Sequence, residues 1–253
     1  MSEARASNDD FYVGYAAAPG ATKAVALTAA PLLVLIAAAF GYFFAVEQAD
    51  TGTGEWRTAL TVTLEGELVA DPYPALLIPG EAGGPAETVF LTTAAKLVPL
   101  DRMEGLVGGA VAATGILVER DGKRVLAVND GAEAIVAGAG PLAGPQTVTP
   151  LGRETLRGEI IDPKCWHGVM KPGEGKTHKA CATLCLFGGM APLFKTTNEA
   201  GVNTTYLMTD SAGRPVTEDI LKYVADPVAV SGALERRGDV IYFKIEPASI
   251  TRL

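Results

Sequence analysis

Residues 228–245 read VAVSGALERRGDVIYFKI, and a related stretch, VAATGILVERDGKRVLAV, occupies residues 111–128. In both stretches apolar residues alternate with small or polar residues, the period-two pattern of a β-strand with one face in a core. A short polar run with a glycine, ERDGKR or ERRGD, interrupts each stretch where a tight reversal needs a positive φ. Each stretch therefore predicts a β-hairpin.

The similarity between these two hairpins extends along the chain, as expected of an internal repeat. Upstream, LEGELVADP (64–72) resembles LRGEIIDP (156–163), and TVFLTT (88–93) resembles TTYLMT (204–209). A short polar, helix-like link precedes each hairpin. We therefore expect two copies of one unit, each with the order strand, strand, short helix, hairpin. This is the order of a five-stranded Greek-key barrel.

The late hairpin segment DPVAVSGAL (226–234) is similar to that of small OB modules in bacterial envelope proteins. The whole chain resembles bacterial membrane-anchored envelope proteins of uncharacterised function, through FYVGY (11–15) and PGEGKTHKACATLC (172–185). The resemblance implies a mainly β fold with tandem OB-like five-stranded Greek-key barrels, and it implies no particular activity. The alternative fold is two unrelated β-sandwich-like pieces.

The amino-acid composition argues for a folded protein that does not bind nucleic acid. The chain has 253 residues, of which 48% are hydrophobic and 20% charged, and its net charge is −8. Enough apolar side chain is present to fill a core, which argues against disorder. An acidic chain without a basic run is a poor candidate for binding nucleic acid.

One long apolar segment precedes the repeats. Residues 24–46 contain no charged side chain, and about 20 apolar residues suffice for a helix to span a bilayer. We expect a cytoplasmic tail at 1–22 and a transmembrane anchor at 23–47, with positive residues before the span and acidic ones after it. In a bacterium this predicts a single-pass inner-membrane protein with its C-terminal head in the periplasm. The alternative, a cleaved signal peptide, has a shorter apolar region of roughly 7–15 residues.

A linker rich in Gly and Pro, AGAGPLAGPQTVTPLG (137–152), separates the two copies. It predicts a first OB-like domain at 48–147 and a second at 148–253. After the shared Asp-Pro pair the second copy is much longer, and we assign a Cys/His-rich insertion to 163–200. A barrel should fold without this insertion, since the first copy lacks it. Loops on a rigid scaffold are the usual location of function.

The insertion contains every cysteine and histidine of the chain. Thiolate and imidazole ligands select copper, iron or zinc over magnesium or calcium. Helical spacing would place Cys181 and Cys185 on one face, with His178 one turn earlier. We expect a metal or redox site, with copper or iron as the leading cofactors and zinc as a third option. The expected ligands are Cys165, His178, Cys181 and Cys185, followed by His167 and Met190.

A disulfide is the competing interpretation, because thiols outside the cytoplasm tend to oxidise. Cys165 would pair with Cys181 or Cys185 and stabilise the loop by ~3 kcal/mol, leaving one free thiol. The loop would then be the docking surface of a structural subunit and would bind no metal. In a redox version of the site, Lys164 would help Cys165 act as a thiol of low pKa.

Other activities have less support. MKPGEGKT (170–177) resembles a phosphate-binding loop, but that pattern requires Gly where the chain has Met170, so we expect no nucleotide. No pairing of a nucleophile with a base is visible, so the sequence supports no enzyme assignment. The leading hypothesis is an accessory protein for electron transfer or metal handling beside a membrane protein complex. The aromatic residues of the tail could dock on that complex.

Overall fold

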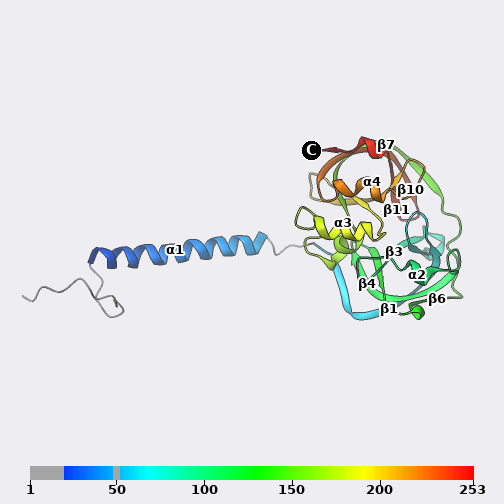
Figure 1. Ribbon diagram of the computed structural model, residues 1–253, viewed down its shortest axis with the longest axis horizontal. Helices are drawn as coiled ribbons and strands as arrows, with labels where there is room; N and C mark the ends of the chain where they lie inside the picture. Colours follow the sequence, from blue (N-terminus) through cyan, green and yellow to red (C-terminus); the bar gives the residue numbers. More distant parts are fainter. Residues whose placement is uncertain (1–19, 48–51) are drawn as a thin grey trace, which may run out of the picture. The chain divides into compact units, whose positions relative to one another are not determined.

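The computed structural model describes residues 20–47 and 52–253. Its two compact units divide at Thr51. Helix α1 (Gly20–Glu47) belongs to the first unit, and all the strands belong to the second (Figure 1). The aromatic tail motif at residues 11–15 lies outside the described residues.

Helix α1 confirms that the apolar segment predicted at 23–47 is helical. Within its span from Gly20 to Val46, an 18-residue window has a mean hydropathy of 2.3. Among the described residues it is the one helix long and apolar enough to cross a membrane, and a signal sequence near the N-terminus would have the same properties. Pro31 lies inside the helix, as is tolerated in membrane-spanning helices.

The first sheet contains six strands and closes on itself. They are β1 (Glu55–Val69), β2 (Ala75–Ile78), β3 (Glu87–Thr93), β4 (Ala110–Arg120), β5 (Lys123–Val128) and β6 (Ile135–Ala137). The sheet order is β1-β2-β3-β5-β4-β6, and β1 also pairs with β4, so five strands form a ring. Within the ring β3 and β5 are parallel and the other pairs are antiparallel. The short helix α2 (Leu100–Met103) lies between β3 and β4 along the chain.

The second sheet repeats this arrangement. Its strands are β7 (Val148–Ile161), β8 (Leu193–Thr197), β9 (Asn203–Asp210), β10 (Pro227–Arg237), β11 (Val240–Ile245) and β12 (Thr251–Arg252). The ring β7-β8-β9-β11-β10 closes through the pairing of β10 with β7, and β9 and β11 are its parallel pair. Helix α4 (Thr217–Ile220) takes the place of α2. The mainly β prediction and the predicted internal repeat are confirmed.

Glycines at matching positions explain why the two halves fold alike. The predicted hairpins are β4–β5 and β10–β11, and their turns contain Gly122 at φ +75° and Gly238 at φ +57°. Gly115 and Gly232 occupy equivalent places on β4 and β10. A Cβ there would lie 2.3 Å and 2.6 Å, respectively, from a backbone oxygen of the facing strand. Only glycine permits this close approach between strands.

Buried side chains form three clusters. One fills the first ring and one the second. A third contains residues from both halves of the chain, among them Tyr73, Phe90, Trp166 and Leu207. The two rings therefore share a core, and residues 52–253 form one compact unit.

The extra segment of the second half joins β7 to β8. It spans residues 162–192 and contains a π-helical turn, η3 (Cys165–Val169), and helix α3 (Lys179–Phe187). The predicted insertion, 163–200, ended too late, because it included β8. That strand pairs with β7 and β9 and is part of the ring, the counterpart of β2.

Candidate metal and thiol site

Two elements of the extra segment carry the thiols. Cys165 opens the turn η3, and Cys181 and Cys185 lie one helical turn apart on α3. The segment KACATLCLF forms this helix because Lys, Ala and Leu are good helix formers. His178 is the residue at the N-terminal boundary of α3, and Gly188 is the residue at its C-terminal boundary.

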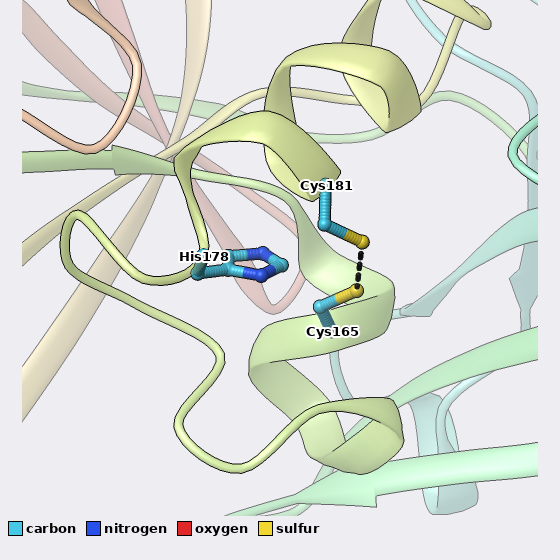
Figure 2. A group of neighbouring side chains, drawn as sticks. All are labelled: Cys165, His178 and Cys181. Atoms are coloured by element: carbon cyan, nitrogen blue, oxygen red, sulfur yellow. Dashed lines mark hydrogen bonds between the residues drawn. The ribbon is translucent and has the colours of Figure 1, made fainter.

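Folding brings three of the predicted ligands together. Figure 2 shows the side chains of Cys165 and Cys181 directed at each other, with the ring of His178 facing them. The two sulfur atoms are 3.6 Å apart, and ligand atoms of the three residues lie within 4.8 Å of one another. Cys165 is 2% exposed and His178 is fully buried, whereas Cys181 reaches the surface in part. All three cysteines are free thiols.

A buried carboxylate orients the histidine. Asp162 Oδ2 lies 2.7 Å from His178 Nε2, and both side chains are inaccessible to solvent. The other carboxylate oxygen, Oδ1, accepts a hydrogen bond from the backbone N–H of Cys165. A carboxylate can only accept, so Nε2 is the nitrogen that carries the hydrogen. Among the described residues, Nδ1 of His178 has no hydrogen-bond partner.

Cys185 also lies close to Cys165. It forms a second group with Cys165 and Asp162, whose ligand atoms also lie within 4.8 Å of one another. The Cys165 thiol is hydrogen-bonded to Cys185, which raises the pKa of Cys165 and lowers the pKa of Cys185. The prediction that Cys165 is a thiol of low pKa is therefore wrong, because this bond and burial favour its protonated form.

Two lysines flank the sulfurs. Lys96 Nζ donates to Cys181 Sγ at 2.6 Å, and this bond raises the pKa of Lys96. Lys164 is buried and donates to the backbone oxygens of residues 93–95. Burial lowers the pKa of Lys164, although Cys185, Cys165 and Asp162 favour its charge. The site thus places two cationic side chains beside sulfur atoms that carry negative charge when they bind a metal.

The other two predicted ligands have different surroundings. His167 points away from the group: its Nδ1 lies against the backbone oxygen of Pro163, and its ring lines a cavity of about 280 Å³ with Arg120 and Trp166. Burial lowers the pKa of His167 to about 4, which keeps the ring neutral. Met190 is buried in the core of the second ring with Cys165 and Cys185.

The spacing of the donors suits one small ion. Two thiolates on a tetrahedral zinc ion, each at about 2.3 Å, are about 3.8 Å apart, close to the observed 3.6 Å. A disulfide requires about 2.05 Å. A metal-bound imidazole usually donates its other N–H to a carboxylate, as His178 does to Asp162. Cys165, His178 and Cys181 therefore form a three-donor set, and Cys185 is a neighbour of Cys165 in a second group.

Sequence reasoning missed two residues of this site. Asp162 belongs to the Asp-Pro pair that both copies share, with Asp71 before Pro72 in the first copy, so the pair alone does not indicate a role in the site. The sequence signal for a role of Asp162 was His178, because the first copy of the repeat contains no histidine that could pair with Asp71. Lys96 belongs to the first half of the chain, and no local pattern connects it with Cys181.

Comparisons with family models, with curated proteins and with solved structures find no match to this chain.

Proposed function

We propose that the chain is a membrane-anchored extracytoplasmic protein that binds one transition-metal ion through Cys165, His178 and Cys181. The observation that carries this proposal is the buried Nδ1 of His178, which has no partner among the described residues. A buried polar nitrogen without a hydrogen bond is costly. A metal ion between Nδ1 and the two sulfurs would satisfy it.

The proposal also covers the fold of the two strand rings and the cellular location of the protein. Both strand rings have the pairing order expected of OB-like barrels, and we assign them to that class. Helix α1 is the proposed inner-membrane anchor, with the head in the periplasm. Its length and hydropathy support this assignment.

Metal handling or electron transfer beside a membrane complex is the role that suits this site. Cys181 is the ligand that reaches the surface in part. Leu184 and Phe187, on the same helix, are 54% and 74% exposed. Contiguous exposed apolar patches mark surfaces that bind another protein, and we propose that these two side chains belong to such a surface. A partner docked there would approach the ion from the side of Cys181.

Metal analysis of the full-length chain in detergent tests the proposal. The reduced protein should bind one Co²⁺ ion, detected by thiolate-to-cobalt absorption, and also one Cu⁺ or Zn²⁺ ion. Cys181→Ser and His178→Ala should each lower the affinity by more than about 100-fold, since even outer partners of a metal site are worth about 10–100-fold. His167→Gln is the matched control and should retain binding within about tenfold, because His167 lies against Pro163, outside the donor set.

The docking subunit with a disulfide-linked loop is the second candidate function. The sulfurs of Cys165 and Cys181 are 3.6 Å apart. This distance favours a Cys165–Cys181 disulfide over a Cys181–Cys185 disulfide. A purified chain that contains one disulfide and one thiol, and binds no metal after reduction, would support this candidate and exclude the metal site.

A further inference from the structure

We infer that Cys165 and Cys181 form a redox-active dithiol whose oxidation to a disulfide expels the bound metal ion, so that thiol–disulfide exchange controls metal release. This inference rests on the proposed metal site. To the metal site it adds a covalent reaction of two ligands, the class of molecule that oxidises them and the order in which the two thiols react.

The geometry makes the two states mutually exclusive. In the reduced chain the sulfurs are 3.6 Å apart, a separation that one shared ion can span. A disulfide brings the same two atoms to about 2.05 Å, and neither then offers a thiolate. The disulfide therefore removes two of the three donors, and His178 alone remains of the set.

Exposure defines which thiol reacts first. Cys165 is 2% exposed and Cys185 is 1% exposed, whereas Cys181 reaches the surface in part. A dissolved disulfide can therefore reach Cys181 and not the other two. Lys96 Nζ, bonded to Cys181 Sγ, stabilises negative charge on the attacking sulfur.

The oxidant belongs to the class of small disulfides, such as oxidised glutathione. The sulfur of Cys181 attacks one sulfur of the oxidant and forms a mixed disulfide. The first glutathione leaves as a thiolate, which takes a proton from water. The sulfur of Cys165 then attacks Cys181 Sγ, and the second glutathione leaves in the same way. Two metal-bound thiolates are oxidised, one disulfide is reduced to two thiols with two protons from water, and the metal leaves as a free cation.

The chain between the two cysteines permits the small approach that this bond requires. Cys165 lies on the π-helical turn η3, and Cys181 lies in the first turn of α3. The connection contains Gly173 and Gly175, the latter at φ +74°. A shift of about 1.5 Å between the sulfurs, the difference from the bonded length, is shared by two short elements and leaves the strand rings intact.

Full-length protein in detergent, reduced and loaded with one equivalent of Co²⁺, provides the test. Oxidised glutathione should abolish the thiolate-to-cobalt absorption, and a reductant should restore it. Peptide mapping of the oxidised protein should identify a Cys165–Cys181 disulfide and a free Cys185. The affinity for Co²⁺ should fall by more than about 100-fold, beyond the effect of losing one outer partner.

Matched variants separate the possible outcomes. His167→Gln should bind Co²⁺ and release it on oxidation as the unmodified chain does, because His167 lies against Pro163, outside the donor set. A stoichiometric Cys165–Cys181 disulfide that leaves cobalt bound, or a disulfide that maps to Cys185, overturns the inference while the metal site stands. A reduced chain that binds no Co²⁺ overturns the proposed function, and the inference with it.

Discussion

Replacing Asp162 by Asn should separate metal binding from stability. In the protein, Oδ1 of Asp162 accepts from the backbone of Cys165, and Oδ2 accepts from Nε2 of His178. Asn keeps an oxygen for the first bond but presents an NH₂ group to the ring. Nε2 must then accept, so the hydrogen moves to Nδ1. An imidazole with a hydrogen on Nδ1 cannot use that nitrogen as a ligand.

The expected magnitudes follow from these contacts. Because Asn restores both buried hydrogen bonds, the free energy of unfolding of the metal-free chain should change by less than about 1.5 kcal/mol. Affinity for the metal should fall by about 10–100-fold, the usual effect of losing the outer partner of a histidine ligand. Asp162→Ala should instead leave two buried donors unpaired, at about 1–3 kcal/mol each, and destabilise the chain by about 2–6 kcal/mol.

Urea unfolding followed by tryptophan fluorescence gives the stability of both variants, and a Co²⁺ titration gives their affinity. The decisive comparison is the Asn variant. If it binds Co²⁺ as tightly as the unmodified chain, Nδ1 of His178 is not a ligand and the reasoning fails. If it is destabilised as much as the Ala variant, the assigned hydrogen-bond pattern is wrong.

Three further variants test the surroundings of the site by the same urea assay. His167 has a pKa of about 4 in the folded protein and about 6.5 in the unfolded chain, so between these pH values only the unfolded chain takes up the proton. The free energy of unfolding should therefore fall by up to about 1.4 kcal/mol per pH unit as the pH is lowered from 6.5 to 4. His167→Gln should remove this contribution. Tyr73→Phe leaves the oxygen of Met208 and the N–H of Val216 without this partner and should cost about 2–6 kcal/mol, about 1–3 for each group. Lys164→Met removes the donor to three backbone oxygens and should cost about 3 kcal/mol. A change within about 0.5 kcal/mol would contradict either of the last two expectations.

The repeat and its hairpins could be predicted because their causes are local. Alternation of apolar residues and the glycines at 122 and 238 determine a strand pair within a few residues of sequence. The same is true of α3, whose spacing places Cys181 and Cys185 one turn apart. These patterns also predicted the region in which the thiols gather.

The remaining parts of the site depend on contacts between distant segments. Lys96 approaches Cys181 because the backbone of Val98 bonds to the oxygen of Gly188. A single sequence contains no signal for that pairing. His167 was expected near the thiols because it is two residues from Cys165, but the π-helical turn directs its ring to Pro163 instead. Residues close in sequence need not belong to one site when a tight turn directs their side chains to different sides.

The core shared by the two rings changes the meaning of the extra segment. The sequence suggests an addition that the second ring could lose, since the first ring closes without one. Yet Trp166 and Ala191, both from residues 162–192, pack in that core beside Tyr73 and Phe90 of the first half. Duplicated modules are usually separable, and here the added segment joins them. A gene that lost it would lose part of the contact surface between the repeats as well as the thiols.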